Sequence, residues 1–418
     1  MNPIEYKNNQ LHIEKINIQE LSNSNQTPFY CYSEESIVNQ YDGLYSAFDM
    51  DIKIFYAMKA NSNLSIIKLL LNKGSGIDVV SGGEIERAIR AGAKGKDIIY
   101  SGIGKTDEEL NYAIESKVHC INVESQSELI RINDISKSLG VKQNIAIRIN
   151  PDVDAKTHIK ITTGMAENKF GIEYDYTESI YKIAADLKNI NIAGISVHIG
   201  SQITSLKPFK KAYTIMYDII KNLRSIGHKI DHVDLGGGLG VSYTTEENIP
   251  TFKEYANLIQ SIFGNADIKV YIEPGRLLVA NSGLLITKVT DVKTTTQKTF
   301  IIVDAAMNDF IRPTLYGSYH EILPIKNNLG TSNKVYDIVG PICETGDYFA
   351  KNRKINSVKI GSIIAIKSVG AYGSVQSSNY NSRPQIAEIL VKDDKYEIIR
   401  ERVEVKDLIK QEKIATWL

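Results

Sequence analysis

The sequence predicts an α/β protein with two domains: an eight-stranded (β/α)8 barrel of the TIM type, followed by a mostly antiparallel β-barrel or β-sandwich domain. Two observations predict this arrangement. Over roughly 230 residues, short apolar runs rich in Ile, Val and Tyr alternate with longer segments of helical period, which is typical of parallel strands joined by crossover helices. After residue 280 the apolar runs are short, β-like and broken by turn residues, with little helical period.

The strands of the predicted barrel can be counted. They lie at residues 52–58, 77–81, 98–101, 120–123, 144–150, 193–199, 232–236 and 269–273. Helical segments between them include 65–74, 82–93, 106–117 and 208–227, several of which begin after Ser, Thr or Asp and end near Gly. Eight such units predict a closed barrel with its active site at the C-terminal ends of the strands. We expect the barrel to span residues 28–280, and the β domain to combine residues 1–27 with residues 281–418.

Composition narrows the classes of function. The 418 residues are 43% apolar and contain no low-complexity tract, which is enough for large cores. Lys plus Arg equals Asp plus Glu at 49 each, so nothing indicates binding to nucleic acid or to an anionic membrane. The N-terminus lacks a signal-peptide pattern, and no apolar run is long enough to cross a bilayer. Cys31, Cys120 and Cys343 lie too far apart for a disulfide framework or a zinc site, so we expect a cytoplasmic protein without a metal.

Polar residues and glycines follow the predicted strands. Lys59 ends the first strand in "FYAMKAN", and taken alone it would be a solvated surface lysine. Taken alone, His198 would be a core histidine, and the glycines of "GGGLG" (236–240) an ordinary turn. The other strand ends carry Ser81, Arg148, Asn150 and the "EPGR" stretch, Glu273 to Arg276. All of them would lie at one mouth of the barrel, which favours a shared function over separate structural explanations.

The chemistry of these residues indicates a cofactor. Consecutive glycines let backbone N–H groups approach an anion, and the loops after strands seven and eight of a barrel commonly hold phosphate. A partly desolvated lysine near other cations can act as an amine nucleophile toward an aldehyde. Phosphate and a reactive lysine together suggest pyridoxal 5′-phosphate. Glu273 would then pair with the pyridine nitrogen and make the ring a strong electron acceptor, and His198 could stack on the ring.

Seven motifs in order resemble one family. They are "YAMKAN", "DVVSGGE", "SVHIGSQ", "DLGGGLG", "EPGR", "GPICETGD" and "GAYG…SSNYNSRP", and together they resemble the diaminopimelate decarboxylases. This family is similar to ornithine and arginine decarboxylases and to alanine racemase, all barrel-type pyridoxal-phosphate enzymes. The resemblance runs from about Thr27 to near the C-terminus. It implies decarboxylation of meso-2,6-diaminopimelate to L-lysine, the last step of lysine biosynthesis.

The resemblance also implies residue roles. Lys59 would form the covalent link to the cofactor, His198 would stack on its ring, and Glu273 would pair with its pyridine nitrogen. The phosphate would be held by Ser201, Gly236, Gly237, Gly238, Gly275 and Arg276, with Tyr372 closing on it. The substrate would contact Arg276, Arg312, Tyr316, Glu344 and Tyr372. Cys343 and Glu344 would come from the other subunit of a homodimer, with Cys343 as the acid that protonates the carbon left after carbon dioxide departs.

The distal end of the substrate distinguishes between relatives. Diaminopimelate has a second amino-acid head, so its pocket needs a cation for a carboxylate and an anion for an ammonium group. Arg276 and Arg312 with Glu344 provide that set, whereas an arginine there would repel a diamine substrate. The segment Ser374 to Gln376 departs from the aromatic and methionine residues expected in the family, which affects the pocket wall. The stretch His158 to Gly164 also resembles the family, but its role does not follow from the residues.

Three alternatives stay open. The first is another decarboxylase of the same group, of the ornithine, arginine or carboxynorspermidine type. The second is an amino-acid racemase, against which Glu273 argues because a racemase typically places an arginine beside the pyridine nitrogen. The third is an inactive regulatory relative, against which the presence of Lys59, His198, Glu273 and Cys343 argues.

Overall fold

A computed structural model gives the structure of the chain at residues 3–155, 158, 163–164, 167–244, 247–327, 334–356 and 358–418. The chain divides into two compact units, which are described separately. One unit comprises Val38–Ser242 and Asn248–Leu278. The other comprises Met1–Ile37, Tyr243–Glu247 and Val279–Leu418.

The first unit is a closed barrel of eight parallel strands, as predicted. Its strands are β5 (Ile52–Ala57), β6 (Gly76–Val79), β7 (Ile98–Tyr100), β8 (Cys120–Val123), β9 (Gln143–Asn150), β11 (Ile190–Ser196), β12 (His232–Asp234) and β13 (Lys269–Ile272). They pair in the order β9, β11, β12, β13, β5, β6, β7, β8, and the pairing of β8 with β9 closes the ring. A short strand, β10 (Ile172–Glu173), pairs with β9 outside the ring. Each strand begins and ends within three residues of its predicted position.

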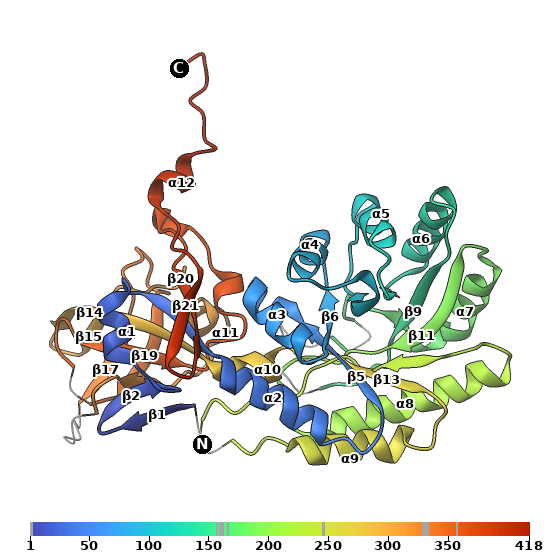
Figure 1. Ribbon diagram of the computed structural model, residues 1–418, viewed down its shortest axis with the longest axis horizontal. Coiled ribbons are helices and arrows are strands. Elements are labelled where there is room, and N and C mark those ends of the chain that lie inside the picture. The colour runs from blue at the N-terminus through green and yellow to red at the C-terminus, as the bar shows by residue number, and fades with distance from the viewer. Residues whose placement is uncertain are drawn as a thin grey trace. The chain divides into compact units, whose positions relative to one another are not determined.

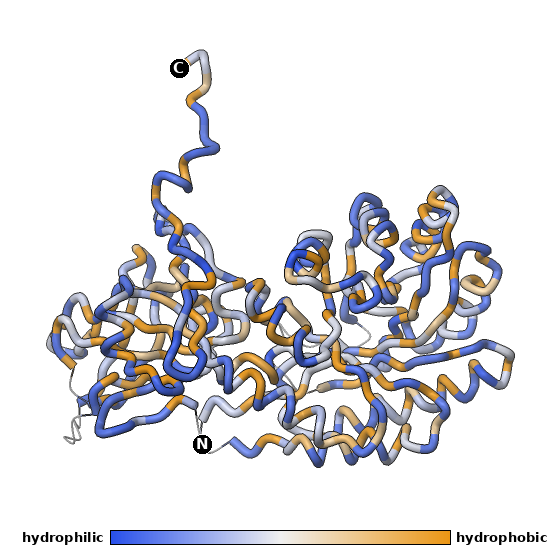
Figure 2. Tube along the Cα trace, viewed as in Figure 1, coloured by the Kyte–Doolittle hydropathy of each residue, from blue (hydrophilic) through white to orange (hydrophobic). Residues whose placement is uncertain are grey.

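Helices precede, connect and follow the strands of the barrel (Figure 1). They are α2 (Glu34–Ser46), α3 (Leu64–Asn72), α4 (Gly82–Arg90), α5 (Asp107–Glu115), α6 (Gln126–Ser138), α7 (Thr177–Asp186), α8 (Leu206–Ser225), α9 (Phe252–Phe263) and α10 (Arg276–Val279). Side-chain caps start several of them: Ser81 accepts from Glu84 N at the start of α4, and Thr106 accepts from Glu109 N at the start of α5. Apolar and polar stretches alternate along these helices in Figure 2, which is typical of helices that bury one face.

The second unit is a mostly antiparallel sheet, also as predicted. Its main path follows the order β18 (Tyr348–Lys354), β17 (Val335–Val339), β15 (Thr299–Val303), β14 (Gly283–Thr294), β4 (Phe29–Ser33), β20 (Ala387–Lys392) and β21 (Lys395–Arg400). The strands β16 (Ile322–Pro324) and β19 (Ile363–Lys367) join it through β14. A three-stranded sheet of β1 (Ile4–Lys7), β2 (Gln10–Ile13) and β3 (Ile16–Asn17) precedes the helix α1 (Ile18–Ser24). The remaining helices are α11 (Arg312–Tyr316) and α12 (Val405–Ile409).

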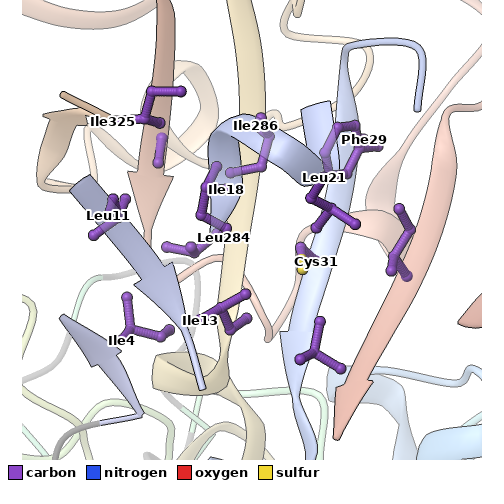
Figure 3. Packing of buried hydrophobic residues seen from close by; sticks show 13 residues of the cluster. Ile4, Leu11, Ile13, Ile18, Leu21, Phe29, Cys31, Leu284, Ile286 and Ile325 are labelled. Atoms are coloured by element: carbon purple, nitrogen blue, oxygen red, sulfur yellow. The ribbon is translucent and has the colours of Figure 1, made fainter. Parts of the chain in front are cut away.

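The core of this second unit combines both ends of the chain. Figure 3 shows Leu11, Ile18 and Phe29 from the N-terminal segment packed against Leu284 and Ile286 of β14. The strand β4 pairs with β14 on one side and with β20 on the other. Residues 29–33 therefore lie in this sheet, whereas the predicted division assigned them to the domain at residues 28–280. Among the described residues, no helix is long and apolar enough to cross a membrane.

Candidate active site

The mouth of the barrel contains a cavity of about 340 Å³. Three of the predicted site residues line it together: Lys59, His198 and Glu273. They follow the strands β5, β11 and β13, so the carboxyl ends of strands far apart in the sequence bring them to one place. The other lining residues are Val80, Ser101, Gly102, Ile103, Asn122, Arg148, Thr163, Phe170, Ser196 and Val197.

Lys59 is held by a buried carboxylate. It lies in a short 3-10 turn, Met58–Ala60, directly after β5, and its side chain is 35% exposed. Its Nζ lies 2.8 Å from Oδ2 of Asp78, whose side chain is fully buried on the neighbouring strand β6. Asp78 Oδ1 has no hydrogen-bond partner among the described residues. The lysine that ends "FYAMKAN" is therefore a half-buried, ion-paired amine at the cavity and not a solvated surface group.

Glu273 lies at the end of β13 and is almost completely buried. Its Oε1 accepts a hydrogen bond from Ser101 Oγ at 3.1 Å. Burial raises the pKa of Glu273 well above its ordinary value, and the negative charges of Asp234 and Asp78 raise it further, while Lys59 opposes them. Burial and the neighbouring negative charges therefore favour the protonated form of this carboxyl group.

His198 is a neutral imidazole whose tautomer is fixed by a backbone hydrogen bond. The backbone N–H of Gly237 donates to His198 Nδ1 at 3.2 Å, so the ring proton is on Nε2. Burial lowers the pKa of His198 well below its ordinary value, and the cations Arg148 and Lys59 lower it further. The ring is thus an uncharged flat surface at the cavity.

Neighbouring backbone atoms leave no room for side chains in the glycine-rich loop after β12. A β-carbon on Gly237 would lie 2.2 Å from the carbonyl oxygen of Glu273, and one on Gly238 would lie 2.4 Å from that of Gly200. Gly236 and Gly238 also have positive φ, at 65° and 111°. The amide of Gly236 donates to Asp234 Oδ1 at 2.9 Å. The amides of Gly236 and Gly237 donate within the protein, whereas those of Gly238 and Leu239 have no acceptor among the described residues.

Ser201, Gly275 and Arg276 lie in the same unit as this loop. Arg276 is buried, and its Nη2 donates to Ser201 Oγ at 3.1 Å. A β-carbon on Gly275 would lie 2.9 Å from the carbonyl oxygen of Ala57, so the loop after β13 passes close to the end of β5. A hydroxyl group, a guanidinium group and backbone amides are suitable ligands for a phosphate.

The residues of the cavity fit pyridoxal 5′-phosphate. Lys59 offers an amine for its aldehyde, and Glu273 a carboxyl group for its ring nitrogen. Three buried acceptors, Asp78 Oδ1, Asn122 Oδ1 and Ser196 Oγ, have no partner among the described residues, as expected where a polar ligand or water completes their hydrogen bonds. The donor groups near Ser201 suit its phosphate.

Arg312 and Tyr316 lie in the second unit, on the helix α11. Arg312 is buried, and its guanidinium group lies over the rings of Tyr243 and Tyr316, 5.8 Å and 5.5 Å from their centroids. Its Nη2 donates to Tyr243 Oη at 3.4 Å. Tyr316 Oη also accepts from Gln376 Nε2 at 3.5 Å. The departure from the family pattern at Ser374–Gln376 therefore places a polar amide beside a predicted substrate residue.

The "CETGD" stretch lies close to α11. Thr314 Oγ1 donates to the carbonyl oxygen of Gly346 at 2.6 Å, which ties this loop to the helix. Cys343 is exposed, and its backbone N–H donates to Asn381 Oδ1 at 3.0 Å. Glu344 is exposed as well, so neither predicted group is buried within its own unit. Tyr372 has a positive φ of 55°, a conformation that costs energy for a bulky residue and is common at functional sites.

Sequence reasoning missed two residues that line the cavity, Asn122 and Ser196, and two buried aspartates bonded to lining residues, Asp78 and Asp234. Asp78, Asn122, Ser196 and Asp234 are polar residues inside apolar strands, and this contrast is the signal that could have identified them. Arg148 forms a buried ion pair with Glu124, at 2.6 Å, and its guanidinium group lies 5.0 Å from the ring of Phe170. In the stretch His158 to Gly164, residues 159–162 lie outside the described residues. Thr163 lines the cavity, and its Oγ1 donates to the carbonyl oxygen of His198 at 2.9 Å.

Comparison with known proteins agrees with this site. Residues 34–280 match the family described as "Pyridoxal-dependent decarboxylase, pyridoxal binding domain". The chain is 44% identical to the diaminopimelate decarboxylase of Aquifex aeolicus, with 96% of this chain and 94% of that protein covered. It is also 44% identical to that of Vibrio cholerae, with 96% and 95% covered. The crystal structure of the M. jannaschii diaminopimelate decarboxylase in complex with L-lysine superposes with a TM-score of 0.94 at 37% identity, covering 100% of this chain and 99% of that one.

The fold and the site define a barrel-type enzyme that uses pyridoxal phosphate. The chain belongs to the pyridoxal-dependent decarboxylases, and its place in that family is among the diaminopimelate decarboxylases. The resemblance read from seven short motifs is thereby confirmed.

Proposed function

We propose that the chain removes carbon dioxide from meso-2,6-diaminopimelate and releases L-lysine, with pyridoxal phosphate bound in the barrel cavity. It is a carboxy-lyase of lysine biosynthesis, as its full-length relatives are by name. The observation that carries the assignment of residues is the convergence of Lys59, His198 and Glu273 on one cavity. When bound, the cofactor supplies an aldehyde that captures the substrate amine and a ring that accepts the electrons of the broken bond.

The barrel residues bind and orient. Lys59, held by Asp78 at 2.8 Å, is the amine that holds the cofactor and returns to it after each turnover. The neutral ring of His198, fixed by Gly237 N–H, packs on the cofactor without adding a charge that would oppose ring protonation. Ser201, Gly238, Gly275 and Arg276 hold the phosphate, and Tyr372 closes on it.

The residues of the second unit recognise the far end of the substrate. Arg312 pairs with the distal carboxylate, beside Tyr316. The partner subunit's Glu344 accepts from the distal ammonium group, and the partner subunit's Cys343 delivers a proton to the α-carbon. The exposure of Cys343 and Glu344 within their own unit supports a role across a homodimer interface. A cytoplasmic location stays a prediction from the cysteine content.

The first test compares substrates. Carbon dioxide release from meso-diaminopimelate, L-ornithine, L-arginine and L-lysine is measured at equal concentrations with purified holoenzyme. We expect release from diaminopimelate alone, because only this substrate has a distal carboxylate for Arg312. Release from a diamine precursor would refute the roles of Arg312 and Glu344, and racemisation without carbon dioxide release would indicate a racemase.

Two variants test the residues. Lys59→Ala is expected to abolish turnover and the covalent cofactor absorbance, whereas Lys53→Ala, on the strand β5 that precedes Lys59, is the matched control and is expected to retain both. Arg312→Ala is expected to raise KM for diaminopimelate by at least about tenfold. Unchanged kinetics in Arg312→Ala would contradict the distal-carboxylate role.

The shared site has its own test. Lys59→Ala and Cys343→Ala are each inactive under the proposal, since each dimer site needs both residues. Mixing and reassembling the two variants is expected to restore roughly one site in four, because random mixing gives half heterodimers with one intact site each. No recovery despite heterodimer formation would place Cys343 in the same subunit's site, whereas an active Cys343→Ala variant before mixing would place Cys343 outside the reaction.

A further inference from the structure

A chain of hydrogen bonds links Glu273 to Asp234 inside the barrel. Ser101 Oγ donates to Glu273 Oε1 at 3.1 Å, and Asn122 Nδ2 donates to Ser101 Oγ at 3.0 Å. The same Asn122 nitrogen donates to Asp234 Oδ2 at 3.0 Å. Asp234 Oδ1 in turn accepts from the amide of Gly236, at the start of the glycine-rich loop.

Asp234 and Glu273 are both buried, at the ends of the paired strands β12 and β13, and Asn122 and Ser101 link their carboxyl groups. Two carboxyl groups buried in one hydrogen-bond network repel each other when both are ionised, which favours one retained proton on the pair as long as no cation lies beside it. Asp234 accepts two hydrogen bonds from neutral donors, Gly236 N–H and Asn122 Nδ2, and these stabilise a carboxylate. Glu273 accepts one, from Ser101, and burial and the charge of Asp234 both raise its pKa. The proton of the pair therefore lies on Glu273.

The surroundings of the pair are short of positive charge. The charged groups that face it are Lys59 and Asp78, which already neutralise each other at 2.8 Å. The charge of Asp234 raises the pKa values of four nearby groups, which are neutral near pH 7, namely Cys120, Tyr213, Tyr255 and Tyr271. Among the described residues no cation is placed against this pair alone, so without a bound cofactor the pair carries one proton and one negative charge.

We propose that Asp234 and Glu273 act as one proton-sharing pair, in which Asp234 is a positioning residue that keeps the negative charge and Glu273 carries the proton taken by the cofactor's ring nitrogen. The O–H bond of Glu273 breaks and an N–H bond forms, with no electron transfer. Glu273 and Asp234 then place two carboxylates near the protonated ring nitrogen. We expect this nitrogen to keep its proton to a higher pH than it would beside one carboxylate. This inference rests on the proposed pairing of Glu273 with the ring nitrogen.

The first experiment uses the cofactor-free wild-type protein. Infrared difference spectra with ¹³C-labelled glutamate are expected to show a protonated carboxylic acid at pH 8, and Glu273→Gln should remove that band. Asp234→Asn should also remove it, because the neutral amide lets Glu273 ionise. A wild-type spectrum without the band would overturn the proposal, and so would a band that persists in Asp234→Asn. The wild-type spectrum needs no variant. It therefore tests the proposal even if Asp234→Asn does not fold.

The second experiment uses the loaded enzyme with cofactor labelled with ¹⁵N at the ring nitrogen. In Asp234→Asn, the pH at which that nitrogen loses its proton should fall, and kcat should fall by at least about tenfold with a smaller change in KM. The matched control is Asp231→Asn, an exposed aspartate just before β12 that pairs with Lys229. If Asp234→Asn keeps the wild-type titration while Glu273→Gln shifts it, the inference fails and the proposed function stands. If neither variant shifts it, the role proposed for Glu273 fails as well.

Discussion

At Gly237 the backbone passes too close to the end of β13 for any side chain. The position of its missing β-carbon lies 2.2 Å from a backbone oxygen, which cannot rotate away as a flexible side chain could. The same residue gives its N–H to His198, so a shift of this loop would also change the tautomer and orientation of the imidazole. The absence of a side chain at Gly237 therefore determines both the path of the glycine-rich loop and the orientation of the His198 ring.

Gly237→Ala is expected to lower the free energy of unfolding of the barrel by roughly 1–3 kcal/mol or more, because the added methyl group forces the loop away from Glu273. Urea denaturation of the cofactor-free protein measures this loss. The matched control is Gly83→Ala, where the β-carbon would lie 3.9 Å from Ser81 Oγ and a helix former enters α4. Equal stability of the two variants would contradict the steric argument.

At the scale of elements, hydrogen bonds link the N-termini of the helices α4 and α5. The helix α5 begins with a capping box, in which Thr106 accepts from Glu109 N and Glu109 accepts from Thr106 N. Glu109 Oε1 also accepts from Gly82 N at 2.9 Å, at the start of α4. Because α4 follows β6 and Asp78, this contact stiffens the part of the barrel mouth that holds Lys59.

Thr106→Ala removes one side of that box and is expected to cost about 1 kcal/mol of stability. The change is measured by chemical denaturation beside Ser138→Ala, an exposed residue in the last turn of α6. We expect the control to change stability by less than about 0.5 kcal/mol. A Thr106→Ala variant as stable as this control would show that water replaces the cap without loss.

Two histidines and a tyrosine are packed together among the strands of the barrel. His232 on β12 stacks on Tyr271, with ring centroids 4.5 Å apart, and His119 lies 3.2 Å from Tyr271 Oη through its Nε2. Burial lowers the pKa of His232 to about 3, helped by His119. Burial and the charges of Lys53 and Lys269 lower the pKa of His119 to about 4.

The barrel is therefore expected to lose stability as pH falls below about 6.5. Below this pH the histidines of the unfolded chain bind protons, whereas His119 and His232 in the folded barrel stay neutral. Since the unfolded state binds more protons between that pH and the folded pKa values, the free energy of unfolding falls throughout this window and levels off near pH 3. Urea titrations at pH 7 and pH 5 should show a loss that is reduced in His232→Gln, compared at each pH with His12→Gln as the control for removing one histidine. An identical loss in wild type and His232→Gln would contradict this account.

At the scale of the whole chain, the second unit is closed by contacts between its two ends. Glu14 is buried, with its Oε1 accepting from Ser33 Oγ at 2.7 Å and from Glu35 N at 2.9 Å. Its Oε2 accepts from the amide of Asp393, in the turn between β20 and β21. One carboxylate thus joins the segment before β4 to the C-terminal hairpin.

Glu14→Gln is expected to destabilise the second unit by roughly 1–3 kcal/mol, because an amide nitrogen would face a backbone donor. Hydrogen exchange at the β20–β21 hairpin should rise in this variant. Glu20→Gln, an exposed change on α1, is the control and should leave exchange unaltered. Faster exchange in both variants, or in neither, would show that Glu14 does not fasten the two ends.

The sequence by itself determined the eight strands, the glycine-rich loop and the positions of Lys59, His198 and Glu273 after their strands, because periodicity and motif order are local properties of the chain. The tertiary structure alone decided that β4 joins the second sheet, since its partners β14 and β20 lie more than two hundred residues away in sequence. It also decided that Asp78 pairs with Lys59 and that Asn122 and Ser101 link Asp234 to Glu273. Those pairings follow from closing the barrel, which places polar side chains of separate strands in one buried space where they must satisfy each other.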